Sequence, residues 1–159
     1  MSAIKKVLVI FGVLILLGGA AIAFIFFMTE RERSQPGVEV TFATIDKQEK
    51  GTKVSIQGYL FLPSSVSWSS ETDANCVDLM EDPTYSYSGR TIVICIVEVE
   101  KIHIPEPNHM DVLGYFFEED DFVVWLNDGR RVGYRAAVRI TGWWNGSGGI
   151  NPVTLVEAP

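Results

Sequence analysis

Cys76 and Cys95 are the residues whose type and spacing most directly suggest chemistry in this chain. If residues 82–89 turn the chain back as a hairpin, the two cysteines come close together on neighbouring strands. A disulfide usually joins residues whose Cα atoms lie about 4.4–6.8 Å apart, and it persists in an oxidising compartment. Two interpretations stay open: a disulfide, or two buried free thiols that act as small apolar residues. A thioredoxin-like site is excluded because the chain has no Cys-x-x-Cys.

Two groups of residues invite comparison with metal sites. His103, His109 and Asp111 do not have a spacing typical of zinc ligands, and prolines stand between the two histidines. The acidic run 118–121 lacks the Asp-x-Asp-x-Asp-Gly pattern of a calcium loop. We therefore expect a surface loop and a solvated acidic corner, with no metal and no cofactor.

Motifs for catalysis are missing from the sequence. It contains no Gly-x-Ser-x-Gly, no His-Glu-x-x-His, no phosphate-binding loop and no dinucleotide fingerprint. The Asn-Gly-Ser at 145–147 fits an N-glycosylation sequon, but we interpret it as an Asn-Gly turn. The sequence thus predicts a protein that is not an enzyme.

Three aromatic residues remain as candidates for recognition. Trp68, Tyr85 and Tyr87 fall in predicted loops, where no core requires a large aromatic side chain. Exposed aromatic side chains together with arginines are a familiar combination at binding surfaces. They are therefore candidate ligand-binding residues.

The N-terminal part of the chain carries an apolar segment at 7–28, which is 22 residues without a charge. A helix of that length spans roughly 30 Å of hydrocarbon. Lys5 and Lys6 precede it and favour an N-terminus on the cytoplasmic side. A cleaved signal peptide is the alternative, because residues 21–23 have a small-x-small pattern, but the apolar run continues beyond them. A soluble core helix is discounted because the segment has no polar face.

We therefore expect a single-pass protein of the cell membrane. Its predicted parts are a cytoplasmic N-terminus (1–6), a transmembrane signal anchor in the lipid bilayer (7–28), a polar stalk (29–37) and an extracytoplasmic domain (38–159).

The domain shows mostly the two-residue alternation of β-strands. The strands are predicted at 53–62, 75–80, 91–99, 122–126, 136–144 and 150–156. The run at 91–99 is nearly all β-branched, which predicts a strand buried on both faces. Residues 109–117 have helical spacing and predict one short helix, while 41–49 fits either a short helix or a strand.

Two of these segments resemble strands of bacterial OB-fold proteins. Gly-Thr-Lys-Val-Ser-Ile-Gln-Gly-Tyr-Leu at 51–60 is similar to their bent first strand, and Ala-Val-Arg-Ile-Thr-Gly-Trp at 137–143 is similar to a late strand. Residues 75–79 and 127–129 resemble segments of small, uncharacterised membrane-anchored or secreted members. The resemblance implies a five- to six-stranded barrel over about 40–157, with no assigned chemistry.

An OB-fold would place two loops beside its ligand face: the loop after the first strand and the loop between the fourth and fifth. We assign these to 63–74 and 127–134, which contribute Trp68, Arg130 and Arg131. The alternative is that Trp68 covers the barrel end and the arginines neutralise the acidic corner.

Charge limits the class of partner. The whole chain has a formal net charge of −7, and all 20 acidic residues but only 11 basic residues follow Phe27. Such a domain repels phosphate, so nucleic acid is an unfavoured partner. The sequence predicts a membrane-tethered binding module whose partner is an envelope protein or glycan. The alternative is a nucleic-acid-binding OB-fold.

Overall fold

The computed structural model describes residues 18–19, 35–62, 67–69, 74–84, 89–99, 107–111 and 118–159. The chain divides into two units, residues 1–35 and residues 36–159. The predicted membrane span at 7–28 lies outside the described residues, apart from Gly18 and Gly19, which are helical. None of the helices within the described ranges has both the length and the apolar character to span a membrane.

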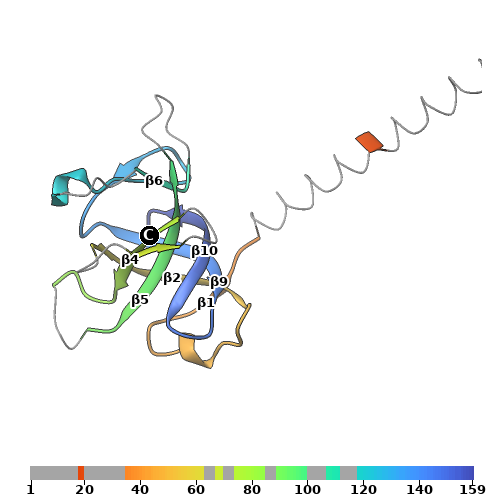
Figure 1. The fold of residues 1–159 in the computed structure, drawn as a ribbon. Helices are drawn as coiled ribbons and strands as arrows, with labels where there is room; N and C mark the ends of the chain where they lie inside the picture. The colour runs from red at the N-terminus through yellow and green to blue at the C-terminus, as the bar shows by residue number, and fades with distance from the viewer. Residues whose placement is uncertain are drawn as a thin grey trace, which may run out of the picture. The chain divides into compact units, whose positions relative to one another are not determined.

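Five strands close into a β-barrel (Figure 1). They are β2 (Lys53–Phe61), β4 (Ala74–Met80), β5 (Thr91–Val99), β9 (Ala137–Trp144) and β10 (Gly149–Glu157). Around the barrel β2 pairs with β4, β4 with β5, β5 with β10, β10 with β9, and β9 with β2. The β5–β10 pair is parallel and the other four are antiparallel. The prediction of a mainly β barrel is confirmed, and the order of strands is compatible with an OB-like fold.

Short strands and two 3₁₀ turns are attached to this barrel. β1 pairs in parallel with the start of β2, and β3 pairs with β4. Between β5 and β9, three further short strands pair in succession, starting from β5. The short strands and two 3₁₀ turns are β1 (Val38–Glu39), η1 (Ile45–Lys47), β3 (Ser67–Ser69), β6 (His109–Asp111), η2 (Glu119–Asp121), β7 (Val124–Trp125) and β8 (Arg131–Val132).

Gly58 explains how one strand serves two sides of the barrel. β2 pairs with β9 over Lys53–Tyr59 and with β4 over Tyr59–Phe61, so the change of partner falls next to Gly58. A Cβ at this position would lie 2.8 Å from both Leu79 Cγ and the carbonyl oxygen of Met80. Only a glycine allows β4 to approach this closely.

The core follows from alternation along the strands. On β5, Ile92, Ile94 and Ile96 are buried in the barrel core. Val93, between two of them, is 41% exposed, because successive side chains of a strand point to opposite faces. The prediction that this strand is buried on both faces is therefore wrong for Val93.

The predicted helix at 109–117 is wrong at its start, because His109–Asp111 forms strand β6. Met110 is fully buried and pairs with Glu98 of β5 on one side and Val124 of β7 on the other. Pairing with two strands distant in sequence overrides the local helical spacing. Residues 112–117 lie outside the described part of the chain.

Candidate functional site

The aromatic residues predicted for recognition are only partly placed. The backbone of Trp68 lies in β3, opposite Asn75 of β4, within the connection between the first two barrel strands. Trp68 is thus in a short strand and not in an open loop. Tyr85 and Tyr87 lie outside the described residues.

The assignment of the second ligand-face loop needs correction. The fourth and fifth barrel strands are β9 and β10, and the turn between them is residues 145–148. Residues 126–130 join β7 to β8, which stand outside the five-stranded barrel. Arg130 and Arg131 therefore do not lie in the loop between the fourth and fifth barrel strands. The sequence could not reveal this, because alternation marks strands without giving their partners.

Arg130 has a local structural role. Its Nε donates to Asp128 Oδ2 at 2.7 Å, and its backbone N–H donates to Asp128 Oδ1 at 3.0 Å. These hydrogen bonds lower the pKa of the Asp128 carboxyl. The turn ends at Gly129, whose φ of +80° suits a glycine. Arg130 thus holds the β7–β8 turn through Asp128.

Arg131 lines a shallow groove of about 600 Å³ beside β8. The exposed acidic residues Glu119 and Asp120 of η2 form part of its wall, and Arg131 and Arg135 supply positive charge. Phe122, Val123, Val132, Gly133 and Tyr134 complete the lining, so apolar and aromatic groups lie among the charged side chains. One surface therefore offers both signs of charge together with apolar and aromatic groups.

Tyr134 and Arg135, which line this groove, both contact the buried ring of Phe61. The rings of Tyr134 and Phe61 meet edge to face, with centroids 5.3 Å apart. The guanidinium of Arg135 lies 5.0 Å from the Tyr134 centroid and 5.8 Å from that of Phe61. Contacts of this kind attract a guanidinium to the face of an aromatic ring.

The backbone at these contacts is fixed by the barrel. The Arg135 N–H donates to the Leu60 carbonyl at 2.8 Å, and the Leu60 N–H donates to the Ala136 carbonyl at 3.0 Å. Arg135 has a φ of +60°, in the left-handed region that is unfavourable for a non-glycine residue. Tyr134 and Arg135 were missed as site residues from the sequence. Their contact with Phe61 joins segments far apart in the chain, so no local pattern indicated it.

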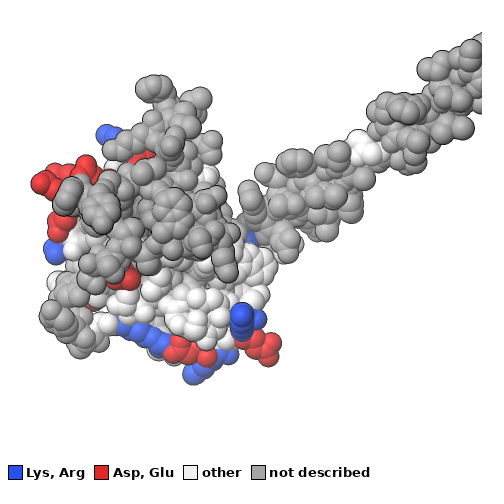
Figure 2. Space-filling view, viewed as in Figure 1, with Lys and Arg blue, Asp and Glu red and all other residues white. Residues whose placement is uncertain are grey.

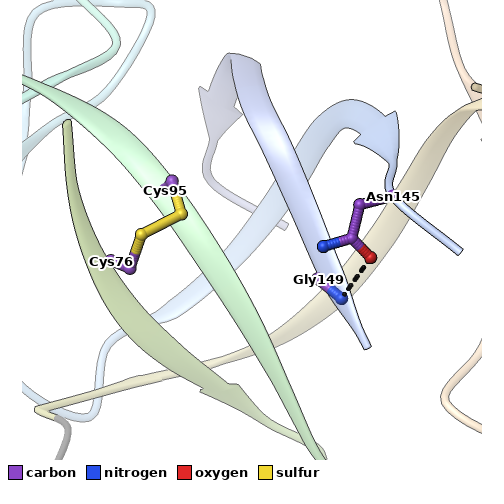
Figure 3. Close-up of a disulfide and its surroundings, with 4 residues drawn as sticks. All are labelled: Cys76, Cys95, Asn145 and Gly149. Carbon is purple, nitrogen blue, oxygen red and sulfur yellow. Dashed lines mark hydrogen bonds between the residues drawn. A yellow bond between two sulfur atoms is a disulfide. The ribbon is translucent and has the colours of Figure 1, made fainter. Parts of the chain in front are cut away.

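The two cysteines form a disulfide across β4 and β5 (Figure 3). It lies apart from the barrel core, while the neighbouring Val77 and Ile94 belong to that core. Of the two interpretations left open by the sequence, the structure has the disulfide.

Asp78, two residues along β4 from Cys76, is half-buried, and desolvation raises the pKa of its carboxyl.

Asn145 acts as a turn residue, as predicted. Its Oδ1 accepts a hydrogen bond from the Gly149 N–H at 3.0 Å (Figure 3). It also accepts hydrogen bonds from the Ser147 N–H at 2.8 Å and the Ser147 hydroxyl at 3.2 Å. Side-chain acceptance of this kind is typical of Asx turns. The hydrogen bond to the Gly149 N–H links the turn to the first residue of β10.

Candidate metal ligands have other partners. His109 Nδ1 lies 2.7 Å from the Pro107 carbonyl oxygen, and Asp111 Oδ1 accepts a 2.8 Å hydrogen bond from Trp125 Nε1. His103 lies outside the described residues. Within the described ranges, no three His, Cys, Asp or Glu side chains gather in a way that could hold a metal ion. Asp and Glu atoms cover η2 at the upper left of Figure 2, as expected for a solvated acidic corner.

Comparison with models of known protein families and with curated protein sequences found no match to this chain. Its function is therefore inferred from the barrel and the groove.

Proposed function

We propose that this chain is a membrane-tethered, extracytoplasmic binding module with an OB-fold, and that it holds a protein of the cell envelope in the groove beside β8. The observation that carries the proposal is the groove itself. Arg131 and Arg135 line it together with Glu119 and Asp120 and with apolar and aromatic side chains. No enzymatic step is proposed.

Two features support the location. The apolar segment 7–28 is long enough for a membrane anchor, and Lys5 and Lys6 favour a cytoplasmic N-terminus. The disulfide between Cys76 and Cys95 would persist in an oxidising compartment and not in the cytosol.

The groove chemistry favours a polypeptide partner. A peptide offers carboxylates and carbonyls to Arg131 and Arg135, amino or guanidinium groups to Glu119 and Asp120, and side chains to the apolar lining. A glycan would use the Tyr134 ring and the hydrogen-bonding groups but would leave the charges without partners. Nucleic acid is disfavoured because Glu119 and Asp120 line the same groove and would repel phosphate.

Location is tested on the full chain in its native membrane. We expect the protein to stay in the membrane fraction after a carbonate wash, and external protease to cut within the stalk at 29–37 or digest the domain. A soluble product that begins near Phe24 would instead show that the N-terminal segment is a cleaved signal peptide.

Binding is tested by placing a photo-crosslinking amino acid at Val132, inside the groove, in the membrane-bound full chain. We expect crosslinks to a specific protein, and we expect Arg131→Ala combined with Tyr134→Ala to reduce their yield about tenfold, because aromatic and arginine anchors carry much of the interface energy. Arg130→Ala is the matched control, since Arg130 is engaged with Asp128 outside the groove. Equal yields from both variants would move the binding surface elsewhere.

A further inference from the structure

The surface around η1 and the start of β2 has a charge opposite to that of the rest of the domain. Lys47, Lys50 and Lys53 recur at three-residue intervals, and we call these three residues the lysine patch. In Figure 2, Lys and Arg atoms lie along the lower edge of the domain, with Asp and Glu atoms between them. Lys47 and Lys50 are exposed and form no ion pair with any described residue.

The acidic residues beside the lysine patch do not cancel it. Asp46 is paired with Arg90, which leaves Glu49 as the neighbouring acid within segment 44–53. The segment together with Arg90 has four basic and two acidic side chains, whereas the remainder of residues 36–159 has five basic and sixteen acidic ones. This segment is therefore net positive in a domain that is negative overall, and a negatively charged surface would attract it more than the rest of the domain.

The lysine patch lies where the chain enters the domain. β1 runs parallel to the start of β2, with Val38 opposite Val54. Gly37 approaches so closely that a Cβ there would lie 2.4 Å from the Val54 carbonyl carbon. Residues 29–35 link the predicted membrane span to this point, and seven residues reach at most about 25 Å.

Trp143 adds an aromatic group to the same side. It pairs with Lys53 across β9 and β2, and the Lys53 Nζ lies 5.9 Å from its ring centroid. The turn after β9 also contacts the lysine patch, because a Cβ at Gly146 would lie 3.1 Å from Lys50 Cβ. Tryptophan beside lysine is typical of surfaces that lie at a membrane–water interface.

From these observations we propose that the lysine patch docks on the anionic headgroups of the membrane in which the chain is anchored. This inference rests on the tether in the proposed function. Each lysine near an anionic bilayer gains only a small attraction. A tethered domain, however, experiences the surface at an effective concentration on the order of millimolar, so weak attraction is enough to orient it.

The docking would present the groove away from the membrane. Lys53 begins β2, and Phe61, which contacts Tyr134 at the groove, ends it. Nine extended residues separate the two ends of the strand by about 26 Å. One end of β2 would thus face lipid, and the other would face the partner.

The test uses the full chain in nanodiscs of phosphatidylcholine alone or of phosphatidylcholine with phosphatidylglycerol. An amine-reactive reagent is added briefly, and labelling of each lysine is measured by mass spectrometry. We expect labelling of Lys47, Lys50 and Lys53 to be about fivefold slower in the anionic discs. High salt should remove this protection, because it screens exposed charges.

Two double variants change the net charge of the domain by the same amount. They distinguish docking through the lysine patch from a general effect of net charge on membrane association. In Lys47→Glu, Lys50→Glu, labelling of Lys53 should no longer differ between the two kinds of disc. In Arg130→Glu, Arg131→Glu, all three lysines should keep their protection in anionic discs.

Equal labelling rates of the three lysines in neutral and anionic discs would overturn lipid docking and leave the tether intact. A chain that does not stay in membranes after a carbonate wash would instead overturn the tether. The two failures are therefore distinguishable.

Discussion

Cys76 on β4 and Cys95 on β5 lie directly opposite each other, with Cα atoms 4.0 Å apart, and their disulfide is separate from the barrel core. This disulfide closes the hairpin that carries residues 81–90. It can therefore stabilise the barrel without contributing to the packing of its interior.

Replacing both cysteines should destabilise the domain. The disulfide spans a sequence separation of 19 residues, for which the loss of loop-closure entropy predicts a cost of about 3 kcal/mol in the free energy of unfolding. Chemical denaturation of Cys76→Ala, Cys95→Ala measures this cost. Reductant should lower the stability of the native protein by a similar amount and leave the variant unchanged; an identical response of both proteins would contradict the prediction.

Two valines provide a matched test of the core. Val138 is fully buried and Val93 is 41% exposed, so the same substitution removes very different amounts of packing. We expect Val138→Ala to cost about 1–3 kcal/mol and Val93→Ala less than about 1 kcal/mol. Denaturation midpoints of the two variants, measured in parallel, show which substitution costs more stability. A larger loss of stability at Val93 would refute the observed orientation of β5.

Gly58→Ala should disturb the bend of β2. The added Cβ would meet the Met80 carbonyl oxygen at 2.8 Å, and a backbone atom cannot move aside as a flexible side chain does. We expect a loss of about 1–3 kcal/mol, which is typical of overpacking. An unchanged thermal midpoint would show that β2 and β4 can separate at this point without cost.

Asp78→Asn should stabilise the domain at neutral pH. Burial raises the pKa of Asp78, so the folded state binds more protons than the unfolded state, and its stability falls as the pH rises from about 3.8 through the raised pKa. Asparagine removes this loss, so the variant should be more stable than the native protein at pH 7 and nearly equal to it well below pH 3.8.

Asp82→Asn is the control of opposite sign. Hydrogen bonds from the Thr84 hydroxyl and N–H lower the pKa of the exposed Asp82, so its ionised form contributes stability above pH 3.8. We expect this variant to lose stability at neutral pH. The thermal midpoint of each variant is measured between pH 3 and pH 7 and compared with that of the native protein. If both variants change the midpoint at neutral pH in the same direction, the opposite pKa shifts of Asp78 and Asp82 are refuted.

Arg135→Gly should separate binding from stability. The left-handed backbone of Arg135 costs a non-glycine residue about 1 kcal/mol, and glycine adopts the same φ without that cost. We expect the thermal midpoint to stay or rise while crosslinking through Val132 falls. A large loss of stability would show that the contacts of Arg135 with Phe61 and Tyr134 are mainly structural.

Much of the barrel could be predicted from the sequence, because the direction of side chains along a strand is a local property. Alternation predicted the strand at 53–62, observed as Lys53–Phe61, and the β-branched run at 91–99 matched Thr91–Val99. The turn at Asn145 was also predictable, since its hydrogen bonds stay within four residues.

The tertiary structure decided which strands pair and therefore where the candidate site lies. The segment 122–126 looks like a barrel strand locally, and 127–134 was assigned to a loop. In the structure β7 and β8 pair outside the closed barrel, which places Arg131 in the groove beside η2. Phe61 and Tyr134 meet only because β2 ends beside the chain that enters β9. Contacts between segments distant in sequence depend on closure of the barrel, and no local periodicity encodes them.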